Sequence, residues 1–185
     1  MISAPTQRKF DLAIASGRPL LPLEAVMVAL DCDEDAALTK IELGLLRWAF
    51  RIECQGAKRM ELRVFSDCVR DYQPIEGAPD YKKLNEKRTA ADLAKTINCI
   101  LPKVGIKRTQ QGDAIRLTAL ARRFTCSASH VTNLVKEGSL VRATVPVASH
   151  ESALILRESV VAFLGGRVEP KILQEERNQK PKGPQ

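Results

Sequence analysis

Apolar residues recur at helical spacing in the segment that begins at Ile115. The positions i, i+3, i+4 and i+7 are occupied by Leu117, Leu120, Ala121 and Phe124, as in an amphipathic helix. Thr125-Cys126 breaks the pattern, and Ser127 is a favourable N-cap for a further helix. That helix turns Val131, Leu134 and Val135 inward and stops at Gly138. Two short helices with a three- to four-residue turn predict a helix-turn-helix.

Alternating β-branched residues follow these helices. RATVPVA, from Arg142, and ALIL, from Ala153, predict two strands, and the polar residues 149–152 predict the turn between them. Such a hairpin is a wing. RESVVAFLGG, from Arg157, then predicts a short helix that ends at its two glycines.

The same pattern occurs 94 residues earlier. Residues 21–49 align without a gap on residues 115–143, and after a three-residue gap VFSDCVRDY, from Val64, falls on ILRESVVAF, from Ile155. The aligned apolar, glycine and cysteine pairs are Leu23 with Leu117, Ala25 with Ala119, Val26 with Leu120, Leu30 with Phe124, Cys32 with Cys126, Gly44 with Gly138 and Leu46 with Leu140. A repeat of this kind predicts two copies of one structural unit.

The order of motifs in the second copy resembles the excisionase and MerR-type winged helix-turn-helix family. LTALARRFTCSASHVTNLVKEGSLVR, from Leu117, and LRESVVAFL, from Leu156, carry the likeness, which covers about residues 114–166. The resemblance implies DNA binding, with the second helix in the major groove and the wing at the minor groove or backbone. VPVASHESA, from Val145, departs from the family because it lacks the Arg and Lys that such wings often show.

The sequence therefore predicts a mostly α-helical chain with small β-hairpin wings, organised as two tandem winged helix-turn-helix domains. The predicted parts are an N-terminal arm (1–20), a degenerate first copy (21–72), a linker (73–113), the DNA-binding second copy (114–167) and a basic, disordered tail (168–185).

The linker is expected to hold one amphipathic helix at about 89–101. Its apolar face, made by Leu93, Ile97, Ile100 and Leu101, would pack on the second copy or pair with another protomer.

Charge separates the two copies. The chain has a net charge of +7, which favours anionic partners. Residues 21–72 hold seven Lys/Arg and ten Asp/Glu, a net charge of −3, whereas residues 114–167 hold seven and three, a net charge of +4. The first copy also begins its second helix with DCDED, from Asp31, where phosphate would be repelled. We therefore expect the second copy to bind DNA.

The candidate DNA-binding residues lie on the two helices of the second copy and at the start of its wing. They are Arg122, Arg123, Ser127, Ser129, His130, Thr132, Asn133, Lys136 and Arg142. The two arginines of the first helix are expected to hold the backbone, and Asn133 can read adenine. The acid-free start of the second helix favours phosphate. The first copy has a smaller prospect of contact with the DNA backbone, through Lys58, Arg59 and Arg63.

Other chemistry is not indicated. The five cysteines form no CxxC pair and there are only two histidines, so we expect reduced thiols, no metal site and no cofactor. No catalytic triad or phosphate-binding glycine loop is visible, so an enzyme is not expected. No apolar stretch is long enough for a membrane span and the N-terminus is polar, so we expect a cytoplasmic, nucleoid-associated protein.

The predicted function is that of a sequence-specific duplex-DNA-binding protein, either a transcriptional regulator or an excisionase-like architectural factor. The alternative is a tandem winged-helix subunit for protein interaction and assembly. Under either reading, a homodimer or a protein partner would use residues 21–101.

Overall fold

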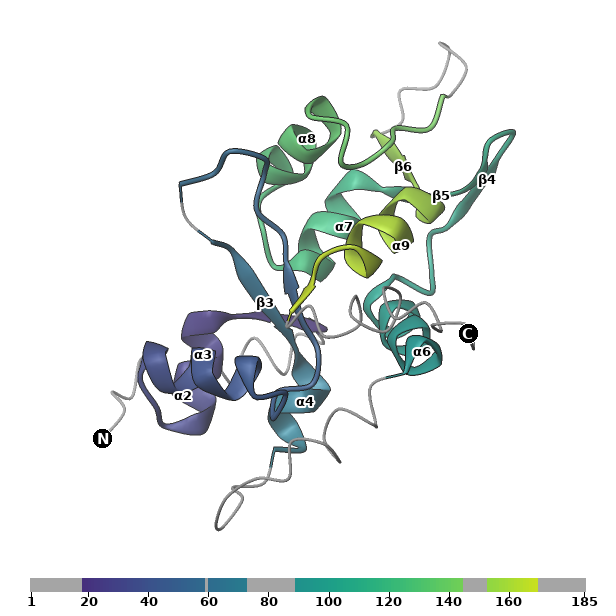
Figure 1. Ribbon diagram of the computed structural model, residues 1–185. Coiled ribbons are helices and arrows are strands. Elements are labelled where there is room, and N and C mark those ends of the chain that lie inside the picture. The colour runs from purple at the N-terminus through teal and green to yellow at the C-terminus, as the bar shows by residue number, and fades with distance from the viewer. Residues whose placement is uncertain (1–17, 59, 73–88, 145–152, 170–185) are drawn as a thin grey trace, which may run out of the picture.

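A computed structural model of the chain describes residues 18–58, 60–72, 89–144 and 153–169. Within these residues the fold is mixed α and β, with seven helices and two small antiparallel sheets (Figure 1). The helices are α2 (Leu23–Leu30), α3 (Glu34–Glu42), α4 (Ser66–Arg70), α6 (Ala90–Ile100), α7 (Leu117–Phe124), α8 (Ala128–Lys136) and α9 (Arg157–Gly165). The strands are β1 (Leu20–Pro22), β2 (Ala49–Arg51), β3 (Leu62–Phe65), β4 (Lys107–Thr109), β5 (Gly112–Arg116), β6 (Leu154–Leu156) and β7 (Val168–Glu169).

The 94-residue offset holds for the bounds of the paired helices. Helix α2 and helix α3 begin and end 94 residues before α7 and α8. The turn residues Asp31 and Thr125 share a left-handed backbone, with φ of 48° and 53°. Asp33 and Ser127 cap the helices that follow, because the side chain of each accepts a backbone N–H three residues on. The two copies thus repeat the same local backbone path through their helix pairs.

A strand precedes each helix pair, which the sequence pattern did not predict. Strand β1 pairs antiparallel with β3, and β5 pairs antiparallel with β6. The register also corresponds, since Leu21 lies opposite Val64 and Ile115 lies opposite Ile155. Each copy therefore closes its helix pair with a strand from its own N-terminal end.

The four-stranded sheet, in the order β1-β3-β2-β7, is a layer between the two copies. Successive residues of a strand point to opposite faces. Leu21, Ala49 and Val64 accordingly join the apolar core of the first copy, together with side chains of α2 and α3. Their neighbours on the opposite face join the core of the second copy, and these are Leu20, Trp48, Phe50 and Phe65. In Figure 1 the sheet lies between α2–α4 and the group of α6, α7 and α9. The copies are parts of one body with a shared core.

The predicted disorder of the C-terminal tail is wrong for its first two residues. Val168 and Glu169, assigned to a disordered tail, form β7 on the open edge of β2. Phe50 lies opposite Val168, and the backbone N–H of Arg51 donates to the carbonyl of Arg167 over 2.8 Å. An open strand edge leaves backbone groups unpaired, and this segment satisfies them. The tail from residue 170 lies outside the described residues.

The predicted linker helix is confirmed as α6, with Thr89 as its N-cap. Of its two expected roles, α6 takes the first, since Ile97 and Ile100 lie in the core shared with the second copy. A hairpin at the C-terminal end of the linker was not predicted. Residues 107–116 form the β4–β5 hairpin, whose turn uses Gly112 at φ 119°, a conformation that favours glycine.

The structure describes the predicted wing of the second copy only at its base. Arg142 forms an isolated bridge to Ile155, and β6 supplies the returning strand. Residues 145–152, expected to be the wing strand and turn, lie outside the described residues.

Candidate nucleic-acid interface

Helix α8 has one buried face and one open face. Val131 and Leu134 are fully buried in the shared core. At 3.6 residues per turn, five other residues fall within an arc of roughly 140° on the opposite side. These are Ala128, Ser129, Thr132, Asn133 and Lys136, of which only Thr132 is partly buried. We call them the α8 face; it carries amide, hydroxyl and ammonium groups and no carboxylate.

Two hydroxyl groups of the predicted site are committed to the helix itself. The Ser127 hydroxyl accepts the backbone N–H of His130 at 3.1 Å, which is the predicted N-cap. The Thr132 hydroxyl donates to the carbonyl of Ala128 at 2.9 Å. Each oxygen retains acceptor capacity, so either hydroxyl can still receive a hydrogen bond from a ligand.

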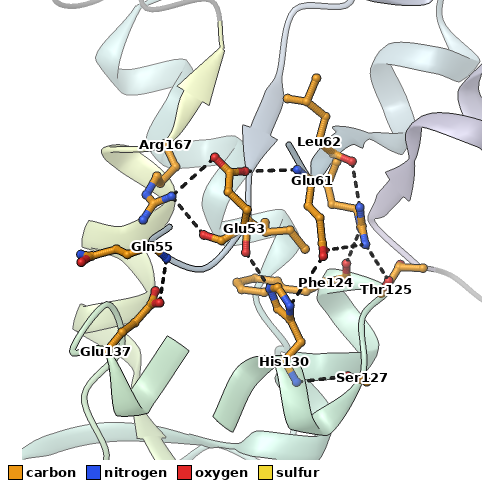
Figure 2. Close-up of polar contacts among 12 residues, drawn as sticks. Glu53, Gln55, Glu61, Leu62, Phe124, Thr125, Ser127, His130, Glu137 and Arg167 are labelled. Carbon is orange, nitrogen blue, oxygen red and sulfur yellow. Dashed lines mark hydrogen bonds and ion pairs between the residues drawn. The ribbon is translucent and has the colours of Figure 1, made fainter. Parts of the chain in front are cut away.

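His130 does not point outward, contrary to the prediction. Its side chain is only 14% exposed, and its Nε2–H donates to the carbonyl of Ile52 at 2.7 Å. Its Nδ1 lies 3.9 Å from a carboxylate oxygen of Glu61. Figure 2 shows the imidazole against the β2–β3 hairpin of the first copy. The spacing of α8 gave no sign of this, because the partner comes from a segment 78 residues earlier.

The two neighbouring arginines of α7 differ. Arg122 is exposed, as its predicted role requires. Arg123 instead donates to the carbonyls of Ile100 and Cys99 at the end of α6, with its Nε 2.5 Å from the former. Burial lowers the pKa of the Arg123 guanidinium. Arg123 therefore connects α7 to α6. This position does not favour the predicted contact with the DNA backbone.

An open pocket of ≈ 540 Å³ lies beside the turn between α7 and α8. Its lining residues are Arg18, Thr118, Ala121, Arg122, Thr125, Cys126, Ser127 and Ala128. Arg18 comes from the predicted N-terminal arm and was not among the candidates. The Thr125 hydroxyl donates to the carbonyl of Leu20 at 2.5 Å, which holds that segment against the turn. Two guanidinium groups thus flank the start of α8.

The remaining cationic candidates, Lys136 and Arg142, are both exposed. Lys136 lies in the last turn of α8, and Arg142 lies at the base of the predicted wing, where it bridges to Ile155. Glu137, the acidic residue nearest to them in sequence, is engaged elsewhere. Its carboxylate accepts the backbone N–H of Gln55 at 2.7 Å and the hydroxyl of Ser139 at 2.7 Å.

Helix α3 presents the matching face of the first copy with the opposite charge. The positions 94 residues before the α8 face are Glu34, Asp35, Leu38, Thr39 and Glu42. Asp31 and Asp33 at the preceding turn are exposed as well. The same backbone therefore displays carboxylates in one copy and neutral or cationic groups in the other.

Arg63 was a lesser candidate for DNA contact, and it is used inside the protein. Its side chain is 12% exposed, and it donates to the carbonyls of Phe124 (3.1 Å) and Thr125 (3.4 Å) at the end of α7. A cation at a helix C-terminus is favourable because the carbonyls there carry partial negative charge. Lys58 remains exposed, and Arg59 lies outside the described residues.

Glu53 is a buried carboxylate that no sequence pattern singled out as a candidate. It is 6% exposed, and Arg51 donates to it at 2.6 Å while Arg167 lies 3.9 Å away. The backbone N–H of Glu61 also donates to it, at 3.3 Å. A buried charge is tolerated when it is paired and hydrogen-bonded, so this cluster fixes the hairpin to the end of the second copy.

Other chemistry is sparse. All five cysteines are free. In the part of the chain that the structure describes, no three His, Cys, Asp or Glu side chains gather as a metal-binding group, and no helix is long and apolar enough to cross a membrane. The chain matches no protein-family model, no curated protein and no solved structure.

Proposed function

We propose that the protein binds duplex DNA sequence-specifically, and that its two copies are tandem winged helix-turn-helix units of which the second reads the DNA. The observation that carries the proposal is the acid-free α8 face bordered by exposed arginines. A transcriptional regulator or an excisionase-like architectural factor would use such a surface.

In this proposal α8 enters the major groove, which admits an α-helix. The exposed Asn133 amide would pair bidentately with an adenine, and Ser129 would meet a base or a phosphate. Arg18 and Arg122 would contact phosphates beside the start of α8, where the helix dipole also favours an anion. Lys136 and Arg142 would contact phosphates near the end of α8. Affinity then comes from the cations and specificity from the amide and hydroxyl groups.

The first copy supports this assignment by contrast. Its α3 face shares the backbone of the α8 face and bears Glu34, Asp35 and Glu42. Carboxylates at those positions would face phosphate and repel it. We therefore assign base reading to one copy only.

The test is a selection of bound duplexes from a random pool with the full chain, followed by titration of variants. Asn133→Ala should weaken binding to the selected site by about 1–3 kcal/mol and relax the preference at one base pair, as expected for loss of a bidentate base contact. The matched control is Thr39→Ala, which changes the equivalent position of α3. Equal effects of the two substitutions, or no selected sequence, would overturn the proposal.

A second candidate function is that of a protein-assembly subunit, which the acidic α3 face favours. This function predicts that Glu34→Lys with Asp35→Lys abolishes self-association in sedimentation experiments. DNA binding without self-association would exclude assembly through a homodimer.

A further inference from the structure

The β2–β3 hairpin of the first copy follows helix α8 of the second copy along its length. At the first turn of α8, the His130 imidazole donates to the carbonyl of Ile52 at 2.7 Å. Just after the last turn, Glu137 accepts the backbone N–H of Gln55 at 2.7 Å. Four consecutive residues of the hairpin, 52–55, therefore lie along the helix from its start to its end.

The hairpin borders the α8 face on one defined side. Asn133 lies at one edge of the α8 face. Viewed along the helix axis, Glu137 and His130 lie just beyond that edge, within roughly 60° of Asn133. The opposite edge begins at Ala128, which lines the pocket with Arg18 and Arg122. A helix in the major groove has a phosphate backbone on each side. The pocket would face one backbone and the hairpin the other.

The tip of the hairpin is cationic, although the first copy as a whole is acidic. No acidic residue lies between Glu53 and Glu61, and the tip sequence is QGAKRM. Lys58 is exposed and has no ion pair with any described residue. Of the two carboxylates near the base, Glu53 is 6% exposed and Glu61 is 40% exposed.

Those carboxylates are occupied within the protein. Glu53 binds Arg51, Glu61 lies 3.5 Å from the Arg63 guanidinium, and Glu137 binds the Gln55 N–H. A phosphate at the hairpin tip would therefore meet the Lys58 ammonium, and each of these carboxylates already has a partner within the protein.

We infer that the β2–β3 hairpin acts as the wing that accompanies α8 on DNA. One duplex then contacts the base-reading helix of the second copy and, through its phosphate backbone, the hairpin of the first copy. The inference rests on the proposed function, and it gives the acidic copy a role in DNA binding. It also accounts for a second-copy wing that is poor in Arg and Lys.

The test compares Lys58→Ala with Lys95→Ala in the full chain. Lys95 is an 80% exposed lysine of α6, so the control removes the same charge away from the hairpin. Because each phosphate contact contributes about 0.9 to the slope of log K against log salt, Lys58→Ala should lower that slope by about one. Between 50 and 200 mM salt, the factor by which Kd increases should then be roughly three times smaller for Lys58→Ala than for the wild type. The base preference should not change, and Lys58→Gln should behave as Lys58→Ala does.

The outcomes separate the two proposals. A wild-type chain that binds no duplex overturns the proposed function, and this inference with it. Specific binding that Asn133→Ala weakens, with wild-type slopes for Lys58→Ala and Lys58→Gln, overturns the inference alone, because the hairpin would then only support α8. A slope lowered equally by Lys95→Ala also overturns it, since the loss would reflect net charge.

Discussion

At the scale of single residues, side chains for which the sequence predicted the same role have different contacts in the structure. Arg122 and Arg123 are adjacent in α7, yet one lines an open pocket and the other bonds the last carbonyls of α6. His130 and Asn133 both lie on α8, yet only Asn133 is open to a ligand. Exposure and partner together decide which candidates can still contact DNA.

The two arginines should therefore have different effects when substituted. Arg123→Ala removes charge-assisted bonds to two carbonyls, and it should lower the free energy of unfolding by about 1.5–3 kcal/mol. Arg122→Ala should leave stability within about 0.5 kcal/mol. It should instead reduce DNA affinity and the salt slope. Urea unfolding and DNA titration measure the two effects, and a loss of stability confined to Arg122→Ala would contradict the assignment.

The cysteines should differ in reactivity in the native protein. Burial raises the pKa of the Cys68 thiol and of the Cys126 thiol to about 11. A pKa above the working pH keeps a thiol protonated, and only the thiolate attacks alkylating reagents. At pH 8, iodoacetamide should modify the exposed Cys99 well before these two, and raising the pH towards 11 should narrow the difference.

Mass spectrometry of timed samples measures the order of modification. Urea-unfolded protein is the control, because all five thiols should react there at similar rates. Early modification of Cys126 in the native protein would contradict its burial.

At the scale of elements, the sequence predicted what local spacing determines. The helix bounds of α7 and α8 follow from apolar periodicity and from the cap at Ser127, and α6 follows from the pattern that begins at Thr89. The strands β4 and β7 were missed because a two- or three-residue strand has almost no pattern of its own. Their pairing depends on partners elsewhere in the chain. The orientation of His130 was missed for the same reason.

At the scale of the whole molecule, the shared core makes the two copies interdependent. Phe50 is fully buried in the four-stranded sheet, and its side chain belongs to the same apolar cluster as Phe124 and Leu164 of the second copy. Separating the copies would expose that cluster to water. We therefore expect one cooperative unit, and experiments on DNA binding should use the full chain.

Phe50→Ala tests this interdependence. Loss of a buried phenyl ring should lower the free energy of unfolding by about 3–5 kcal/mol. Unfolding followed by far-UV circular dichroism, which reports all helices, should coincide with unfolding followed by the fluorescence of Trp48, the only tryptophan. Val104→Ala, at an 87% exposed position, is the control and should change neither curve. Separate transitions for the two signals would show that the copies unfold independently.

The pairing of β7 with β2 also governs the order of events during synthesis. Phe50 of β2 cannot pair with Val168 of β7 until the ribosome has made the 118 residues that follow Phe50. At about 5–20 residues per second, the ribosome makes that stretch in roughly 6–24 s. Throughout this interval the nascent first copy has an open strand edge and an uncovered apolar sheet face, both of which are prone to aggregation. A slow-translating cell would prolong that exposure, so the yield of folded protein should depend on elongation rate more than the modest length of the chain suggests.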